Sequence, residues 1–328
     1  MASRFMFFFF LTLLGCSPKH ELVVHRGYAL GTSYSIQYEA LSADYETAQK
    51  GIDSVFYAVN QSLSTYLPAS DISKINEGDS LLVIDHHFLK VFEKADELYR
   101  ITQGYFDPTV GAWVNAYGFG PDQKIQNLSS RVRDSLKEIT SWSKITLTSS
   151  GTIKKSHPSI YLDFNAIAKG YAVDVIGDFL TGLGSKNHLV EIGGELVAKG
   201  QNIKSGFPWR VGIDRPIEKE ERVIQNIVEL QDYALATSGN YRKFRVDKET
   251  GEKYVHSINP LNGEPVRSNV LSVSVKAPNC MTADAFATAL MVMPFEQSKK
   301  LIEQDPSLSA YWILTGPKGL EEVFSSNW

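Results

Sequence analysis

The sequence contains only two cysteines, Cys16 and Cys280, among 328 residues. A disulfide scaffold is therefore excluded, because such folds use a high density of cysteines in place of a large core. With 24 glycines and 13 prolines, the chain also lacks the composition of a collagen-like repeat. Basic charge is not in excess, since 33 Lys and Arg stand against 37 Asp and Glu. This balance argues against a nucleic-acid-binding protein, which normally carries a basic excess.

Several familiar catalytic signatures are missing as well. The sequence has no P-loop, no GxGxxG segment after a strand and no GxSxG segment, and its histidines lack HExxH spacing. These absences leave the nucleotide triphosphatase, Rossmann, hydrolase and zincin classes without support.

Aromatic residues, by contrast, are plentiful. The chain has 17 Phe, 15 Tyr and 5 Trp, and 43% of its residues are hydrophobic. Such a composition excludes disorder as a global description and supplies a sizeable core. The length suits one large domain or two lobes of ordinary size.

The amino terminus carries a processing signal. Arg4 precedes an apolar segment, Phe5 to Leu14, which is shorter than the ~20 residues needed to span a bilayer. The segment ends in Leu-Leu-Gly-Cys, which resembles a lipoprotein processing site with Cys16 as the lipidated residue. We therefore predict a membrane-anchored lipoprotein with the lipid on Cys16. A plain secretory signal with an incidental cysteine is the alternative.

This processing predicts three regions of the chain. They are a signal peptide (1–15), the lipidated Cys16 with a short tether (16–21), and one functional domain (22–328). Once Cys16 is lipidated, no intramolecular disulfide can form, and Cys280 is expected to be a small buried side chain. No later segment is long and apolar enough to predict a transmembrane helix.

Hydrophobic spacing predicts helices and strands without strict alternation, which favours an α+β fold over a doubly wound parallel sheet. The predicted helices cover about 43–63, 88–99, 168–179, 282–292 and 296–304. The predicted strands cover 33–38, 188–192, 195–198, 209–213, 227–230, 270–275 and 311–314, with a Gly-Gly turn between the second and the third.

Four segments have the composition of functional sites. Glycines and aromatics alternate over 104–120, which suits either a planar ligand or a loop that packs its aromatics into the core. The segment 161–172 passes from a strand into a helix whose start could bind an anion next to Lys169. The competing interpretation is simple capping by Asp163 or Asn165, with an exposed lysine.

Asp284 and Thr288 are four residues apart on a predicted helix, so they share one face. A carboxylate and a hydroxyl are hard oxygen ligands that suit Mg²⁺, although Asp284 could instead interact with the helix dipole. His256 lies just before a turn and could titrate near neutral pH, but a lone histidine is more often structural.

In this order and spacing, the segments resemble the ApbE family, flavin transferases that use FAD to attach FMN to a protein. The resemblance spans about Leu30 to Met293. Its motifs are Leu30-Gly31-Thr32, Ser64-Thr65-Tyr66, Phe106 to Gly111, Asp163 to Gly170, Val190 to Glu195, Gly212 to Pro216, Ala236 to Tyr241, the His256 segment and Thr282-Ala283-Asp284.

The resemblance implies a two-lobed, T-fold-like α+β architecture and a set of site residues. His256 and Asp284 would be catalytic, and the Ala166 carbonyl, Asp284 and Thr288 would bind Mg²⁺. The implied FAD contacts are Leu30, Tyr66, Tyr105, Phe106, Asp107, Asp163, Lys169 and the backbone near Ile258.

The sequence departs from the family pattern at a few of these segments. Leu30 stands where Met is usual, a change that conserves volume. Asn259 and Asn262 replace the usual Asp and Thr, which removes a carboxylate near the site. Some relatives carry Asp at the position of Ala287, so fewer protein oxygens are left here for a metal.

The implied reaction transfers the FMN part of FAD to a threonine or serine hydroxyl of a flavoprotein, with release of AMP. Implied acceptors are subunits of sodium-pumping NADH:quinone reductase or of the related Rnf complex. Because those acceptor sites face the outer side of the inner membrane, the resemblance implies an inner-membrane lipoprotein that faces the periplasm or extracytoplasmic side. Two alternatives stay open: a Mg²⁺-dependent FAD pyrophosphatase with water as the acceptor, and a flavin-binding lipoprotein without catalysis.

Overall fold

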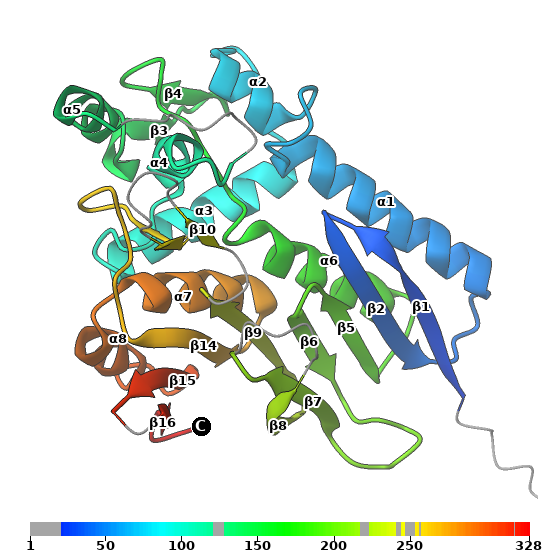
Figure 1. Ribbon diagram of the computed structural model, residues 1–328. Helices are drawn as coiled ribbons and strands as arrows, with labels where there is room; N and C mark the ends of the chain where they lie inside the picture. Colours follow the sequence, from blue (N-terminus) through cyan, green and yellow to red (C-terminus); the bar gives the residue numbers. More distant parts are fainter. Residues whose placement is uncertain are drawn as a thin grey trace, which may run out of the picture.

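The computed structural model describes residues 21–120, 128–216, 223–240, 244–246, 253–255, 257–317 and 319–328. Its centre is an eight-stranded sheet in the order β1-β2-β5-β6-β9-β14-β15-β16, in which every neighbouring pair is antiparallel (Figure 1). The α+β prediction is confirmed, with the sheet purely antiparallel. The strands of this sheet are β1 (Leu22–Ala29), β2 (Thr32–Glu39), β5 (His188–Ile192), β6 (Glu195–Lys199), β9 (Tyr233–Gly239), β14 (Val270–Ala277), β15 (Ser309–Gly316) and β16 (Gly319–Phe324).

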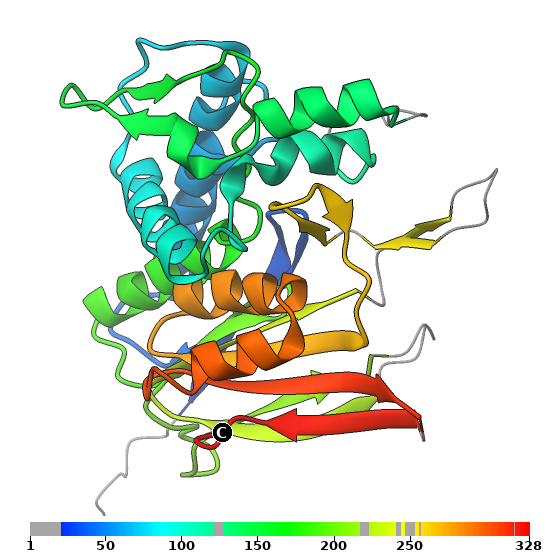
Figure 2. The same cartoon turned by 90° about the vertical axis from the view of Figure 1, so that its left-hand side faces the viewer.

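Helices cover one face of the sheet, and a separate group of helices lies beyond them (Figure 2). Those of the covering layer are α1 (Tyr45–Leu63), α6 (Ala168–Gly182), α7 (Cys280–Val292) and α8 (Phe295–Ile302). The others are α2 (Asp71–Glu77), α3 (His86–Ile101), α4 (Gly111–Ala116) and α5 (Ser130–Glu138), with 3₁₀ turns at Pro108–Val110 and Trp142–Lys144. Within the described residues, no helix is both long and apolar enough to cross a membrane.

Four two-stranded ribbons complete the part of the fold that the structure describes. They are β3 (Ile145–Leu147) with β4 (Ile153–Lys155), β7 (Trp209–Asp214) with β8 (Ile224–Leu230), β10 (Phe244–Val246) with β11 (Lys253–Val255), and β12 (Ile258–Asn259) with β13 (Glu264–Pro265).

The alternation of side chains along β15 shows how the sheet separates two cores. Ala310 and Trp312 point into the large core shared with the helices, whereas Tyr311 and Ile313 point into a smaller core. That smaller core also contains Trp209 of β7, so the β7–β8 ribbon covers the second face. Because successive side chains of a strand point to opposite faces, a strand buried on both sides must be apolar throughout.

The helices and strands predicted from hydrophobic spacing are all present. The helix predicted from residue 282 begins two residues earlier, because Asn279 caps it by accepting a hydrogen bond from the Thr282 N–H at 2.9 Å. Gly193 and Gly194 form the predicted turn, both with positive φ. Cys280 is buried, as predicted.

The predicted capping of α6 by Asp163 or Asn165 is wrong. The chain makes an additional turn first, in which the Ile167 and Ala168 N–H groups both donate to the Phe164 carbonyl. The helix therefore starts beyond the reach of both side chains, with Ile167 at the N-cap and no side-chain cap. Asp163 instead accepts from the Asn165 N–H at 2.7 Å and stabilises the preceding turn.

Candidate active site

The candidate site is built where the start of α6 meets α7. The Gly170 N–H donates to Asp284 Oδ2 at 3.0 Å, which ties the first turn of one helix to the middle of the other. A Cβ atom at position 170 would lie 2.4 Å from the Cys280 carbonyl oxygen and 2.8 Å from Asp284 Cβ. Only glycine allows so close an approach. Asp284 is therefore bound to a helix start, but to that of α6 and not to that of its own helix.

A lysine lies between two carboxylates at this contact. Lys169 Nζ is 2.5 Å from Glu195 Oε1, with the glutamate side chain 7% exposed and the lysine 31%. Burial lowers the pKa of Lys169, but the charges of Asp284 and Glu195 raise it, so that the pKa ends above its usual value. Burial raises the pKa of Asp284, an effect that the charge of Lys169 opposes.

The sequence predicts no role for Glu195 beyond its place in the Val190 to Glu195 motif, yet its side chain belongs to this cluster. Its Oε2 atom is buried without a hydrogen-bond partner among the described residues. A buried carboxylate oxygen of this kind calls for a cation or a donor from a ligand. The signal that could have identified it is a charged residue at the start of a buried strand, directly after the Gly-Gly turn.

The residues implied as metal ligands gather at the same contact. Asp284 and Thr288 lie one turn apart on α7, and Thr288 Oγ1 is 3.4 Å from Ser238 Oγ of β9. Ala166 lies in the turn that leads into α6, four residues before Gly170. These oxygens fit a hard cation such as Mg²⁺, which keeps several waters or phosphate oxygens as its other ligands.

Two further observations bear on this donor set. No group of three or more His, Cys, Asp or Glu side chains positioned to hold a metal occurs in the described part of the chain. A metal here would therefore depend on one carboxylate and on neutral oxygens. Ala287, one turn after Ala283 on α7, is fully buried in the large core and offers no oxygen to a metal.

The implied flavin contacts differ in what their side chains do. Tyr66 is 61% exposed and lies near Asp163, whose charge adds to burial in raising the tyrosine pKa. Leu30 occupies the two-residue turn between β1 and β2 with φ of 51°, together with Gly31 at 74°. Both conformations are left-handed, as a type I′ hairpin turn requires.

The side chains of Phe106 and Asp107 are used by the scaffold. Phe106 is 3% exposed within the large core. Asp107 Oδ1 accepts from the Thr109 N–H and hydroxyl at 2.8 and 2.6 Å, and Oδ2 accepts from the Trp142 N–H at 3.0 Å. Tyr105, by contrast, is half-buried at the edge of the core, so part of its ring is available to a planar ligand.

The β12–β13 hairpin lies against the same region. Tyr117 donates to the Gly263 carbonyl at 3.2 Å, and Arg133 pairs with Glu264 at 2.5 Å, so α4 and α5 hold the hairpin in place. Ile258 is buried beside Trp113. His256, the implied catalytic histidine, lies outside the described residues.

The two asparagines that depart from the family pattern have defined roles in this hairpin. Asn259 accepts from the Leu261 N–H at 3.0 Å, and Asn262 accepts from the Glu264 N–H at 2.9 Å. Both line a cavity of about 510 Å³ that extends to Met293 beyond the end of α7. Both neutral side chains thus stabilise the turn between β12 and β13.

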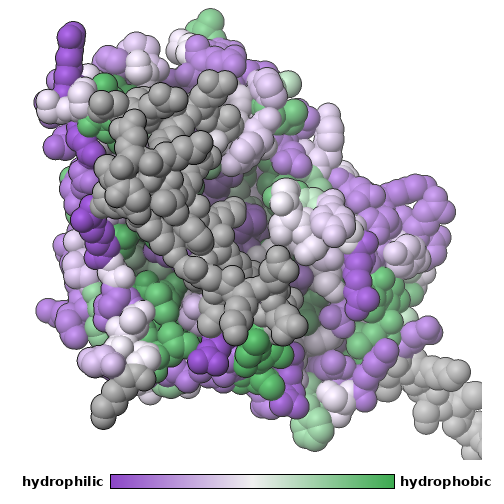
Figure 3. Space-filling model, viewed as in Figure 1, coloured by the Kyte–Doolittle hydropathy of each residue, from purple (hydrophilic) through white to green (hydrophobic). Residues whose placement is uncertain are grey.

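Hydrophilic side chains dominate much of the coloured surface on the face seen in Figure 1, with smaller hydrophobic areas between them (Figure 3). The charged residues of the site come from elements that are distant in sequence but adjacent in the fold. Of the predicted site residues, Lys169, Asp284 and Thr288 are brought together, Tyr66 and Asp163 are near one another, and Phe106 and Asp107 point into the scaffold.

Known proteins resemble this chain over nearly its full length. The sequence matches the ApbE family over residues 30–312. A Vibrio cholerae protein named FAD:protein FMN transferase is 37% identical over 322 residues, which cover 97% of this chain and 95% of that protein. A Haemophilus influenzae protein of the same name is 33% identical over 328 residues, which cover 96% and 93%.

Solved structures agree with these sequence matches. The flavin transferase ApbE from Vibrio cholerae has a TM-score of 0.84 at 36% identity, covering 94% of this chain and 98% of that chain. The apo form of the Pseudomonas stutzeri flavinyl transferase ApbE has a TM-score of 0.83 at 28% identity, covering 94% and 96%. The resemblance expected from the motifs is confirmed, and the chain belongs to the ApbE family.

Proposed function

We propose that this chain is an FAD:protein FMN transferase. The hydroxyl oxygen of a threonine or serine in the acceptor protein forms a bond to the phosphorus of the FMN part of FAD. The bond from that phosphorus to the AMP oxygen breaks, AMP leaves, and the hydroxyl proton is released. The observation that carries the proposal is the cluster of half-buried Lys169 with buried Glu195 and Asp284, which lies at the contact of α6 and α7 in a chain of this family.

Lys169 and the start of α6 are suited to the pyrophosphate of FAD. Lys169 stays protonated because Asp284 and Glu195 raise its pKa, so it supplies positive charge at neutral pH. Its ion pair with Glu195 restricts the side chain to one position before the substrate arrives. Tyr66 and Tyr105 are suited to contact the planar ring system of the flavin.

We assign a Mg²⁺ ion to Asp284, Thr288 and the Ala166 carbonyl. When bound, Mg²⁺ would neutralise negative charge on the pyrophosphate. Asp284 contributes the carboxylate, and its hydrogen bond from Gly170 keeps one oxygen directed at the start of α6. His256 would assist removal of the acceptor proton or stabilise charge.

The acceptor and the membrane anchor also belong to the proposal. Flavoprotein subunits of sodium-pumping NADH:quinone reductase or of an Rnf-type complex are the proposed acceptors. Lipidation of Cys16 would hold the enzyme on the extracytoplasmic side of the inner membrane. Tethering both partners to one membrane raises their effective concentration.

The test incubates the purified protein with FAD, Mg²⁺ and an acceptor domain that carries the threonine motif. Intact-mass spectrometry should show a mass gain on the acceptor that matches FMN, and EDTA should abolish it. Asp284→Ala should lower the transfer rate by at least about 100-fold, since it removes the proposed carboxylate ligand. Asp178→Asn, which changes an exposed carboxylate of α6 about two turns beyond Gly170, is the matched control and should transfer at the wild-type rate.

Other outcomes would contradict parts of the proposal. Free FMN and AMP without a modified acceptor would favour the pyrophosphatase alternative. Intact FAD that stays bound with every acceptor would favour a flavin-binding protein. Full Mg²⁺-dependent transfer by Asp284→Ala would overturn the metal assignment.

A further inference from the structure

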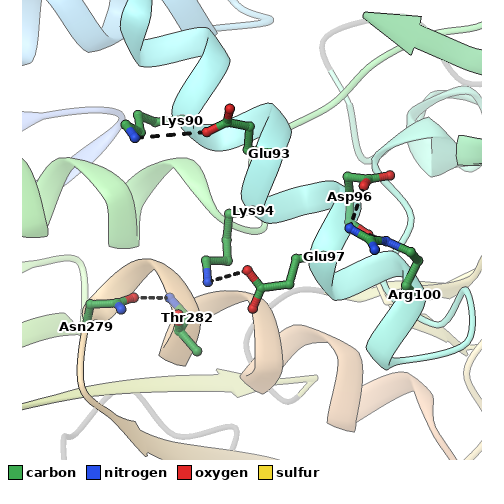
Figure 4. A network of polar contacts seen from close by, with 8 residues as sticks. All are labelled: Lys90, Glu93, Lys94, Asp96, Glu97, Arg100, Asn279 and Thr282. Carbon is green, nitrogen blue, oxygen red and sulfur yellow. Dashed lines mark hydrogen bonds and ion pairs between the residues drawn. The ribbon is translucent and has the colours of Figure 1, made fainter.

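The start of α7 is held by a carboxylate that belongs to another helix. Asp174 of α6 accepts from the Cys280 N–H through Oδ1 at 2.7 Å and from the Met281 N–H through Oδ2 at 2.8 Å. Asn279 caps the next free N–H group locally, that of Thr282 (Figure 4). The first N–H groups of a helix have no partner within it, so two of these three depend on Asp174.

The two helices hold each other at two levels that are one turn apart. On α6, Gly170 and Asp174 are separated by four residues, and on α7, Cys280 and Asp284 have the same separation. Asp174 receives the N–H groups at the start of α7, while Asp284 receives the Gly170 N–H near the start of α6. These two reciprocal contacts determine how closely the helices approach and which turn of α6 lies opposite Asp284.

Packing leaves little freedom to compensate if one of these contacts is lost. A Cβ atom at Gly170 would lie 2.4 Å from the Cys280 carbonyl oxygen, so the backbones are already in close contact. Asp284 is 3% exposed and lies beside Lys169, whose pKa responds to its charge. A small shift of α7 would therefore move the Asp284 carboxylate relative to the start of α6.

Asp174 also lines a cavity of about 390 Å³, together with Asp178 and His188. This cavity does not make Asp174 a ligand, because both of its carboxylate oxygens already accept backbone hydrogen bonds. The role of Asp174 follows from these two hydrogen bonds, which hold the start of α7.

We propose that Asp174 is a positioning residue of the active site. By holding the start of α7 against α6, it directs Asp284 at the proposed site of the metal and pyrophosphate. Asp174 touches neither group itself. The inference rests on the proposed metal assignment of Asp284, because it is through Asp284 that Asp174 acts. Residues that orient metal ligands in this way commonly contribute 10–100-fold to metal affinity or activity.

The test uses Asp174→Asn in the full chain. Asparagine has the same size but offers one acceptor oxygen, and its NH₂ group would face a backbone N–H. The variant should need about 10-fold more Mg²⁺ for half-maximal FMN transfer, and it should bind Mn²⁺ about 10-fold more weakly when free Mn²⁺ is counted by electron paramagnetic resonance. At saturating metal, its kcat should stay within about threefold of wild type.

Two controls separate positioning from stability. Asn279→Ala removes the local cap of α7 and should lower the unfolding temperature without moving the metal half-saturation. Asp178→Asn changes a carboxylate one turn beyond Asp174 on α6. It should alter neither the unfolding temperature nor the metal concentration for half-saturation. If Asp174→Asn does not fold, Asp174→Glu, which keeps both oxygens on a longer side chain, must show the metal shift.

The possible failures are distinguishable. Wild-type protein that transfers FMN and binds FAD without any metal would refute the metal assignment, and this inference with it. Wild-type protein that needs the metal, together with an Asp174 variant of unchanged metal half-saturation, would refute the inference alone. A drop in stability shared equally by the Asp174 and Asn279 variants, with no metal shift in either, would also overturn it.

Discussion

At the scale of single residues, the site depends on charges that are buried but compensated. Lys169 is surrounded by Glu195 and Asp284, so a positive charge is retained where an isolated buried lysine would tend to lose its proton. Removing one partner of such a cluster leaves the other charge without compensation, which costs more than the pair contributes. The cluster therefore suits a negatively charged ligand that binds together with a cation.

His188 gives a residue-scale prediction about pH. The side chain is 2% exposed, and burial together with Lys199 lowers its pKa from 6.5 to about 4. The unfolded chain binds this proton at higher pH than the folded one, so stability is fully present above pH ~6.5 and is lost as pH falls towards ~4.

Replacing His188 removes that pH dependence. Between pH 7 and pH 5, wild-type protein should lose about 1–2 kcal/mol more unfolding free energy than His188→Gln does, as follows from the two pKa values. Urea unfolding at each pH measures the difference. Parallel pH profiles of the two proteins would show that His188 does not titrate in this way.

At the scale of elements, the contact of α6 with α7 determines where the residues of the site lie. Gly170 lets the helices approach closely, and the two start points exchange hydrogen bonds through Asp174 and Asp284. Polar pairs also line the exposed face of α3 beside α7, with Lys94 and Glu97 2.8 Å apart (Figure 4). Each exposed ion pair of that kind contributes at most about 1 kcal/mol to stability. The buried hydrogen bonds that Asp174 and Asp284 accept across the contact of α6 and α7 therefore matter more.

Two glycines of α6 allow a matched test of this contact. Gly170→Ala should destabilise the protein by about 1–3 kcal/mol, because the added methyl group overlaps the Cys280 carbonyl, and it should slow FMN transfer. Gly182→Ala in the same helix meets nothing within 4 Å and should be neutral or stabilising by up to about 1 kcal/mol.

Chemical unfolding and the transfer assay measure both variants. If Gly170→Ala and Gly182→Ala had the same stability, the backbones at this contact would be further apart than the structure has them.

At the scale of the whole molecule, the sheet serves as a base from which distant segments reach one site. Its first strands, β1 and β2, carry the Leu30 turn, and β6 carries Glu195. Helices α6 and α7 lie on the same face, and the β12–β13 hairpin reaches it through α4 and α5 (Figure 1). The large core runs through the sheet, α6 and α7 as one cluster, whereas the hairpin packs with α4 and α5 in a separate small cluster.

The proposed anchor is tested on the whole chain, since Cys16 lies outside the described residues. Cys16→Ala should move the protein from the membrane fraction to the soluble fraction of expressing cells, because no lipid can then be attached. Fractionation followed by intact-mass measurement detects both the shift and the lost lipid mass. Membrane association that persists in the variant would indicate another mode of attachment.

Much of the fold was predictable from local patterns. The helix over 43–63 has a clear hydrophobic period, and the strand over 311–314 is a short continuous apolar run. Both form because burial of apolar surface outweighs other local preferences. Strand β9 was not predicted, since its sequence YALATSG has no alternating pattern and its place in the middle of the sheet depends on β6 and β14.

The sequence by itself determined the family, the main elements and the residues Lys169, Asp284 and Thr288 as candidates, because motif order and helical spacing are properties of the chain alone. Only the tertiary structure decided that Glu195 pairs with Lys169 and that Asp174 holds α7. It also assigned Phe106 and Asp107 to the scaffold. The physical reason is that burial and hydrogen-bond partners depend on segments up to about a hundred residues away, as Asp174 is from Cys280, and no local pattern encodes that distance.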